Sequence, residues 1–491
     1  MHDSHAGSGR RRWLLAAVVL LMLAVSPVSR GSQSNASASV DFESLAGRFG
    51  WAEAFARVHG YPDGLPRVRE GSSSPQPASH AVAEVSWLPT GVVYLPIVSR
   101  FVPKPMMERR ALWITRYDWT TLTQAPAPSV IDTMVANAAS AHLNTLLFQV
   151  RAAGDAYYTP GLEPWAARLT TGPISVTLGI DPGWDPLQHM LDAAHAAGLE
   201  VHAYVNVYPA WLSPLTQTYG LLWPPATVPP QMFDRFTYGP SYLEHPGEYS
   251  LGFTWRHYDS SGQYMPLSWN QYLWASPGLD EVQSYIAAVV RDIVARYAVD
   301  GVHLDLVRYA GSDYSYDPFS NAAAGAIKTA ARDQWQRDRV TALVQQIADD
   351  THAVRPNALV SAAVWPYYMD LWNWGLSEGY SDYYQDSKGW LAQGAVDAIA
   401  PMLYGSRADD FEVWQILAAD FIGADVGGQV YPGIGAHYAS FDAVSDRIEA
   451  ARQMGAPGHV LFSYGYVDRN GYWDDLLAGP YQQPAQPPPL P

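Results

Sequence analysis

The sequence predicts an α/β fold: a (β/α)8 TIM barrel with a long insertion after its third strand and a disordered N-terminal linker. Short apolar runs alternate with amphipathic stretches of helical period, which is typical of parallel strands joined by helical crossovers. Eight such runs fall within residues 106–480, the number that closes a barrel. A doubly wound open sheet is the rival. It loses support because the chain has neither G-x-G-x-x-G after its first strand nor a P-loop sequence.

The eight expected strands are short runs rich in aliphatic residues. They cover 110–116, 144–151, 200–207, 301–309, 358–365, 397–404, 430–435 and 459–464. Amphipathic stretches lie between most of these runs. They cover 131–142, 186–197, 280–297, 332–354, 411–421 and 441–454. Because a helix that links two parallel strands packs over them, this order predicts a ring of helices around a parallel sheet.

The third connection is unusually long. Residues 208–278 separate the third strand from its helix, whereas ordinary connections of this kind have about 2–6 residues. A long loop at the C-terminal end of a barrel strand usually builds part of the active site, so we expect this one to face the substrate. The alternative is an insertion that packs its own small core. The tryptophans of this segment are Trp211, Trp223, Trp255, Trp269 and Trp274.

Both ends of the chain are expected to lie outside the barrel. Three arginines at 10–12 precede an apolar run at 13–25, which predicts a secretory signal within residues 1–30. That run is short for a membrane span, which needs about 20 residues, and an uncleaved anchor is the alternative. Residues 31–105 form a Ser/Pro-rich linker, expected to be mostly disordered, and 481–491 form an extended, disordered Pro-rich tail. We therefore expect a secreted or cell-surface protein.

Composition narrows the class of partner. The 491 residues carry a net charge of −17, which argues against binding to nucleic acid or to an anionic membrane. The absence of cysteine excludes disulfides, thiolate catalysis and lipidation at cysteine. The chain has 19 Trp, 31 Tyr and 13 Phe, more rings than a core needs, and such rings suit stacking on sugars. We expect a carbohydrate partner and no cofactor.

Polar side chains recur on three consecutive strands that should be apolar. Residues two apart on a strand face the same side, so one face of each strand carries the polar set. That set comprises Gln149 and Arg151, then His202, Tyr204 and Asn206, then His303 and Asp305. A buried Asp or Arg is costly unless it is paired, so these residues predict a site at the barrel mouth. A structural Arg151–Asp305 ion pair is the alternative.

Glycoside chemistry suits this set better than metal chemistry does. His202, His303, Asp305 and Asn206 could cluster, but no H-E-x-x-H or H-x-H spacing is present, and we expect no metal. Glycosidases need two carboxyl groups at one bond, or one carboxyl with substrate assistance. Asp305, at the end of the fourth strand, is the best candidate. Its partner must come from a loop at the same mouth, although each such residue could instead be an ordinary loop carboxylate or a helix cap. The candidates are Asp155, Glu163, Asp370 and Asp386.

Several sequence motifs of this chain resemble those of a known protein family. Residues 148–165 read F-Q-V-R-A-A-G-D-A-Y-Y, then E-P-W, and resemble the signature of the glycosyl hydrolase-like family 10. The resemblance continues through 185–206, resumes at 297–305 and at 386–404, and covers roughly 109–464. It implies a (β/α)8 barrel that acts on a polysaccharide, and some relatives are linked to cell-wall glycan. By position, it implies a polar site made of Gln149, Arg151, Asp155, Glu163, His202, Asn206, His303, Asp305, Asp386 and Tyr404.

Two departures from related patterns bear on mechanism. Many family members carry a second acid directly after the Asp of the fourth strand, where this chain has Leu306. Two residues further on this chain has Arg308, which we expect to hold an anionic or carboxylate group. Residues 300–307 also look like the D-G-x-D-x-D-x-E run of family 18 chitinases. Here His303 and Val307 replace two of its acids, so the chitinase mechanism cannot simply be transferred.

These observations predict an exported glycoside hydrolase, with Asp305 as acid/base and Glu163 or Asp155 as second carboxylate. Trp211 and Trp365 are expected to stack on sugars. The residues expected to bind substrate are Gln149, Arg151, His202, Tyr204, Asn206, His303, Arg308, Trp365, Asp386 and Tyr404. The alternative is a carbohydrate-binding barrel without catalysis, because acids found in related sequences are missing. A cell-surface scaffold is a third possibility.

Overall fold

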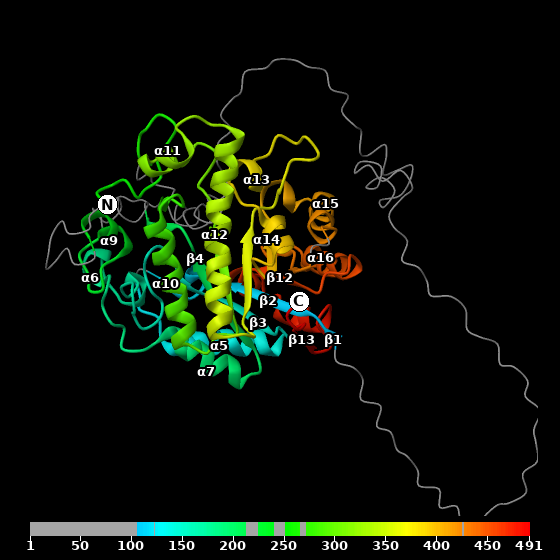
Figure 1. Ribbon diagram of the computed structural model, residues 1–491. Helices are drawn as coiled ribbons and strands as arrows, with labels where there is room; N and C mark the ends of the chain where they lie inside the picture. Colours follow the sequence, from blue (N-terminus) through cyan, green and yellow to red (C-terminus); the bar gives the residue numbers. More distant parts are fainter. Residues whose placement is uncertain (1–105, 122, 213–223, 240–250, 266–271, 425–426) are drawn as a thin grey trace, which may run out of the picture. The chain divides into compact units, whose positions relative to one another are not determined.

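The computed structural model describes residues 106–121, 123–212, 224–239, 251–265, 272–424 and 427–491. The expected signal segment and linker lie outside these residues. In the described part, strands form an inner layer and helices lie around them (Figure 1). Within the same ranges no helix is long and apolar enough to cross a membrane.

The inner layer is a parallel sheet with the strand order β10-β9-β8-β7-β4-β3-β2-β12-β11. Only Tyr431 and Pro432 separate β10 from β11. These two short strands form one position, since β10 pairs with β9 and β11 pairs with β12. The sheet therefore closes on itself with eight positions, which confirms the predicted barrel. The strands are β2 (Arg109–Ile114), β3 (Thr145–Arg151), β4 (Glu200–Asn206), β7 (Gly301–Asp305), β8 (Leu359–Val364), β9 (Ala398–Pro401), β10 (Gln429–Val430), β11 (Gly433–Gly435) and β12 (Gly458–Phe462).

A helix follows every strand position. Local sequence explains their boundaries: α7 begins where Asp185 accepts hydrogen bonds from two backbone N–H groups and Pro186 occupies the first turn. Helix α10 turns Val282, Ile286 and Val290 toward the sheet at intervals of four residues. The helices around the barrel are α5 (Pro128–Ser140), α7 (Pro186–Ala196), α10 (Asp280–Arg296), α12 (Ala330–Val354), α14 (Ser387–Gln393), α15 (Phe411–Ile422), α16 (Phe441–Gln453), α17 (Tyr464–Asn470) and α18 (Trp473–Ala478). Shorter ones are α4 (Arg116–Trp119), α6 (Ile174–Thr177), α11 (Pro318–Ala324) and α13 (Gly379–Asp382).

The segment after β4 packs a small core of its own and also reaches the barrel mouth. Strands β5 (Pro209–Leu212) and β6 (Tyr272–Trp274) pair antiparallel, and helix α9 (Met232–Tyr238) lies between them in the chain. Trp255 is fully buried with its ring centroid 5.5 Å from that of Phe233, so the insertion has a core of its own. Trp211 is also buried and is not placed as an exposed stacking platform. Tyr272 and Trp274, in contrast, reach the barrel mouth, as described below. Trp223 and Trp269 lie outside the described residues.

The C-terminal tail corrects one expectation, because it is extended but ordered. Strand β13 (Ala485–Gln486) pairs in parallel with β1 (Met106–Met107). Side chains from the N-terminal ends of barrel strands bind its carbonyl groups: Arg110 donates to Gln483 O over 2.8 Å, and Gln429 donates to Pro489 O over 2.8 Å. Leu490 packs against the apolar cluster inside the barrel. Proline-rich chain has few N–H groups to satisfy, so donors on the barrel are enough to fix it.

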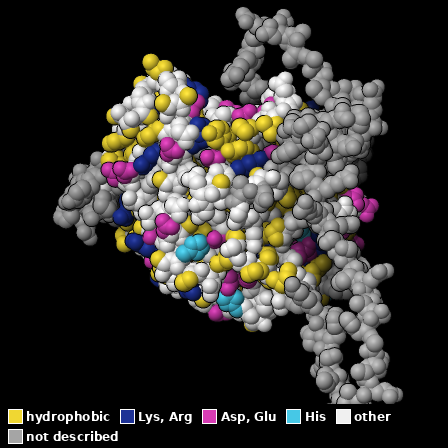
Figure 2. Space-filling view, turned by 45° about the vertical axis from the view of Figure 1, so that its right-hand side comes forward, with side chains coloured by type: hydrophobic (Ala, Val, Ile, Leu, Met, Phe, Trp, Pro, Cys, Tyr) yellow, Lys and Arg dark blue, Asp and Glu magenta, His cyan; other side chains and the backbone are white. Residues whose placement is uncertain are grey.

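The surface of the described part mixes side-chain types. On the face in Figure 2, hydrophobic side chains gather in several groups, with acidic and basic side chains between them. Inside the barrel a second apolar cluster includes Trp113, Leu147, Tyr204 and Ala400. This filled interior forms a floor, so a ligand can enter only at the ends of the strands.

Candidate active site at the barrel mouth

Asp305 ends β7 at the C-terminal mouth, with Asn206 of β4 opposite it in the register. The Tyr204 hydroxyl donates to Asp305 Oδ2 over 2.6 Å, and the Leu306 backbone N–H donates to Oδ1 over 2.6 Å. Burial raises the pKa of Asp305, although these two donors and the charges of Arg308 and Arg116 act in the opposite direction. A carboxyl group with a raised pKa can hold a proton at higher pH than an ordinary Asp, which a general acid requires.

The backbone after Asp305 is strained. Leu306 has φ +52°, a left-handed conformation that non-glycine residues rarely adopt. Its N–H bonds the carboxylate that precedes it, so the turn fixes the carboxyl orientation. Strain of this kind is found preferentially at functional sites, where surrounding contacts maintain it.

Gln149 and Asn206 are held together beside the mouth, as the sequence predicts. Gln149 Nε2 donates to Asn206 Oδ1 over 3.1 Å, and Gln149 Oε1 accepts from the backbone N–H of Arg116 over 2.9 Å. The Arg116 guanidinium donates to the same oxygen and, over 2.7 Å, to the Tyr272 hydroxyl of the insertion. Sequence reasoning missed Arg116, which follows the first strand, because polar alternation was traced only on the next three. The basic residue directly after β2 was the available signal.

Arg308 and Trp365 also meet at the mouth. The Arg308 guanidinium carbon lies 5.1 Å from the Trp365 ring centroid, 4.5 Å from that of Tyr383 and 5.2 Å from that of Trp274. The indole of Trp365 is fixed by a 2.7 Å hydrogen bond to Ser377 O. Trp274 belongs to the insertion that the sequence predicts to face the substrate, but neither Trp274 nor Tyr383 was predicted individually, because the segments that carry them have no periodic pattern.

Aromatic rings form the floor beneath Asp305. Tyr404 stacks on Phe462 with ring centroids 4.5 Å apart, and Trp113 lies edge-on to both. Trp113 Nε1 donates to His303 Nε2 over 2.9 Å, so His303 carries its proton on Nδ1 and donates it to Ser361 Oγ, 2.9 Å away. Burial lowers the pKa of His303 to about 3. His303 is therefore a neutral support for the floor, with both nitrogens occupied, and the structure does not place it against substrate.

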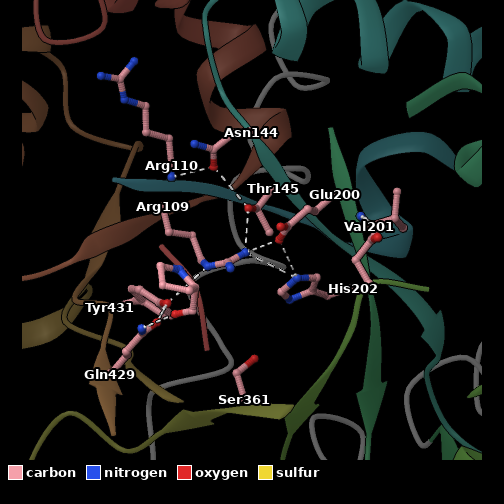
Figure 3. A network of polar contacts seen from close by, with 12 residues as sticks. Arg109, Arg110, Asn144, Thr145, Glu200, Val201, His202, Ser361, Gln429 and Tyr431 are labelled. Carbon is pink, nitrogen blue, oxygen red and sulfur yellow. Dashed lines mark hydrogen bonds and ion pairs between the residues drawn. The ribbon is translucent and has the colours of Figure 1, made fainter. Parts of the chain in front are cut away.

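His202 lies near the opposite end of the barrel. It pairs in register with Gly301, four residues before Asp305, which is roughly 13 Å along the strand. Its Nε2 lies 3.3 Å from Glu200 Oε2, and Arg109 also bonds that carboxylate (Figure 3). A cavity of about 10 Å³, with room for about one water molecule, lies between this network and His303. His202 thus belongs to a buried network at the N-terminal end and not to the mouth.

Arg151 and Glu163 form a structural ion pair, which corrects the predicted inward position of Arg151. The register shifts between Gln149 and Arg151, so strict alternation fails at this point of β3. Arg151 bonds both carboxylate oxygens of Glu163 over 2.8 Å, and both side chains are fully buried. It also donates to Val207 O over 3.1 Å. An acid that is ion-paired at both oxygens and has no exposed surface cannot reach a substrate at the mouth, whereas Asp305, which is also bonded at both oxygens, is only partly buried.

The other predicted carboxylates are mostly turn and cap residues. Asp386 accepts from Gly389 N as the cap of α14 and, over 2.8 Å, from the Tyr368 hydroxyl. Asp370 accepts from three backbone N–H groups of its own loop. Asp155 is 5% exposed and accepts from Ala153 N over 2.9 Å, with no ion pair in the described ranges.

One acid near the mouth was missed. Asp118 follows β2 and accepts from Thr115 N over 2.7 Å and from Gly465 N over 3.1 Å. It thereby joins the loops after the first and the eighth strand positions. Burial raises the pKa of Asp118 to about 6. The spacing of Thr115 and Asp118, a capping box, was the signal in the sequence. Across the described ranges no group of three or more His, Asp or Glu residues could hold a metal ion.

Comparisons with known proteins agree with this architecture. The model of the family "Glycosyl hydrolase-like 10" matches residues 108–212 and 250–424. Glycosyl hydrolase DigH of Escherichia coli (strain K12) is 28% identical over 295 residues, which are 56% of this chain and 58% of DigH. Glycosyl hydrolase YngK of Bacillus subtilis (strain 168) is 25% identical over 429 residues, 78% of this chain and 74% of YngK. The chain thus spans little more than half the length of the first of these relatives.

A solved structure shares the fold. The PgaB (BpsB) glycoside hydrolase domain from Bordetella bronchiseptica superposes with a TM-score of 0.51 at 11% sequence identity. The match covers 75% of this chain and 98% of that domain. At this identity the likeness concerns the barrel alone.

Proposed function

Because the chain belongs to the glycosyl hydrolase-like 10 family, we propose that it is a glycoside hydrolase that cleaves a polysaccharide at the C-terminal mouth of its barrel. The observation that carries the proposal is the environment of Asp305. It is partly buried at the end of β7, has a raised pKa and is oriented by Tyr204 and Leu306. The names of the two relatives support the same reaction class.

Asp305 would act as general acid in this reaction. Its protonated carboxyl gives a proton to the glycosidic oxygen as the bond to the sugar breaks. The carboxylate that results is stabilised by the Tyr204 hydroxyl and the Leu306 N–H, which already point at its two oxygens. Trp365 and the floor ring of Tyr404 offer faces on which sugar rings can stack.

The mechanism needs a second carboxyl group or its substitute. Glu163 is fully buried in its ion pair with Arg151, so the role falls to Asp155, to Asp118 near the mouth, or to a group of the substrate itself. Asp155→Asn and Asp118→Asn separate the three cases. Loss of activity comparable to that of Asp305→Asn assigns the role to the residue replaced, and retained activity of both variants supports substrate assistance.

We also propose export of the protein and action on a cell-wall glycan. The basic and apolar residues at 10–25 support export, and the resemblance to cell-wall-linked relatives supports the substrate. Fractionation of cells checks the first point: the protein should be found outside the cytoplasm, and a version that lacks residues 1–30 should remain inside.

The decisive test is hydrolysis of a panel of purified glycans by the wild type and by Asp305→Asn. Loss of an acid/base group should slow cleavage by about 100-fold or more. Asp192→Asn, on the exposed surface of α7, is the matched control and should keep full activity. Full activity of Asp305→Asn on a cleaved glycan would remove Asp305 from the reaction.

A carbohydrate-binding barrel without catalysis is the second candidate. In the described part of the chain, the strongest influences on the pKa of Asp305 come from burial, Tyr204, Leu306, Arg308 and Arg116, and none of these is a second carboxylate. Glycan binding without product from any member of the panel would favour this function.

A further inference from the structure

Arg308 is a buried cation that the protein itself leaves incompletely bound. Its side chain is 9% exposed and lies three residues after Asp305. A guanidinium has five N–H donors, yet the described structure gives it one acceptor, Tyr309 O at 3.1 Å. Its Nε has no partner, and no Asp or Glu oxygen of the described residues lies within 4.0 Å.

Other buried arginines of the described residues bind more acceptors, although the Nε of Arg116 and that of Arg332 also lack a partner. Arg151 bonds both oxygens of Glu163. Arg332 bonds three backbone carbonyl groups, and Arg116 bonds the oxygens of Gln149, Tyr117 and Tyr272. Burying a charge without such partners is costly. Arg308 therefore differs from these arginines in having a single acceptor for its five donors, at the mouth of the barrel.

The rings around Arg308 fix its orientation. Trp274, Trp365 and Tyr383 face the guanidinium carbon at 5.2, 5.1 and 4.5 Å. Cation–π contacts stabilise the charge but satisfy no N–H group, so the edge of the guanidinium stays available. These rings come from strand β6 and from the loop after β8, which makes the arrangement a built site and not a chance contact. Planar N–H pairs of this kind match the two oxygens of a carboxylate.

We propose that Arg308 binds a carboxylate carried by the sugar at the cleavage site, so that the protein prefers acidic over neutral glycans. The inference rests on the proposed function only in taking the mouth as the glycan site. The charge at the mouth agrees with this inference. Two cations, Arg308 and Arg116, act there on the single acidic group of Asp305, although the net charge of the whole chain is −17. Because both terminal nitrogens of Arg116 are already hydrogen-bonded, Arg308 is the residue that would meet the substrate anion.

The test compares acidic glycans with chemically matched neutral ones. The probes are oligogalacturonate and peptide-free peptidoglycan glycan strands, each also prepared with its carboxyl groups reduced to alcohols. Calorimetry measures binding to the full chain. At least one acidic probe should bind the wild type on the order of 10- to 100-fold more tightly than its reduced form, the range for hydrogen bonds between charged groups.

Variants assign that preference to Arg308. Arg308→Gln should abolish it, and Arg308→Lys should keep only part of it, because Lys retains the charge without the paired N–H geometry. Arg339→Gln is the control, since Arg339 pairs with the exposed Asp280 on the outer helices and should leave binding unchanged. Thermal unfolding verifies that each variant is folded. The Lys variant keeps the test valid if the Gln variant does not fold.

The outcomes separate this inference from the proposed reaction. Equal binding of acidic and reduced probes, failure of both acidic probes to bind, or a preference that survives in Arg308→Gln would each overturn the assignment. Preferential binding without hydrolysis leaves Arg308 assigned and removes the glycosidase. Hydrolysis of neutral glycans without a preference for acidic ones supports the glycosidase and overturns the role of Arg308.

Discussion

Replacing Glu163 by Gln tests whether this acid is structural or catalytic. The carboxylate accepts hydrogen bonds from Arg151 at both oxygens over 2.8 Å, and neither side chain is exposed. Gln keeps the size of Glu but carries an NH2 group in place of one oxygen, so a donor would face a donor of the guanidinium. The substitution also leaves the buried charge of Arg151 without its counter-ion.

The magnitude follows from that geometry. Removing one partner of a buried ion pair costs about 3–5 kcal/mol of unfolding free energy, because the remaining charge is left uncompensated. The carbonyl groups of Asn206 and Val207, which Arg151 also binds, keep the loss toward the lower value. Replacing both partners, as Arg151→Met with Glu163→Leu, should cost less than Glu163→Gln alone, because no buried charge remains.

Urea unfolding measures the stability, and glycan hydrolysis by the folded fraction measures activity. We expect Glu163→Gln to be destabilised and still active at a temperature where it remains folded. A variant with wild-type stability, within about 0.5 kcal/mol, and a 100-fold loss of activity would refute the structural role and return Glu163 to the candidates for catalysis.

Three further predictions follow from the same structure. Activity should fall as pH rises through the raised pKa of Asp305, because the general acid loses its proton, and a rate–pH profile should show that limb in the wild type. Stability should fall as pH drops below about 6.5, because burial lowers the pKa of His303 to about 3 and that of His459 to about 4. The unfolded chain then binds protons that the native state does not, and unfolding free energies measured from pH 7 to pH 4 check this; a flat profile contradicts it. Removing residues 483–491 should lower stability by about 1–3 kcal/mol, through loss of the β1–β13 pairing and of Leu490 packing, and should leave the activity of the folded mouth intact.

The barrel could be predicted because its evidence is local. Every strand position is a short aliphatic run, and the intervening helices show their own period. Alternation also placed Asp305, Tyr204 and Asn206 correctly on the inner face, since β4 and β7 pair without a break. The same rule failed at Arg151, where the register of β3 shifts, and no residue type in that run announces the shift.

The tail shows a different limit of sequence reasoning. Its composition, rich in proline and glutamine, is typical of disorder. What orders it is a set of donors far away in the chain, among them Arg110, Asn144 and Gln429, whose common location at one end of the barrel exists only after folding. Composition indicates how a segment behaves by itself, whereas the order of this tail depends on its hydrogen-bond partners in the barrel.

The roles of the inward polar residues depend on their position along the barrel axis. At the N-terminal end Glu200, with a pKa lowered to about 2, stays charged and is bound by Arg109. In the middle His303 is neutral and fully bonded. At the mouth, Asp305 is only partly buried and Arg308 makes a single hydrogen bond, so both can meet a ligand. Strand alternation reports which face a residue takes but not its depth, and in a barrel the depth decides whether a polar residue supports the floor or meets the substrate.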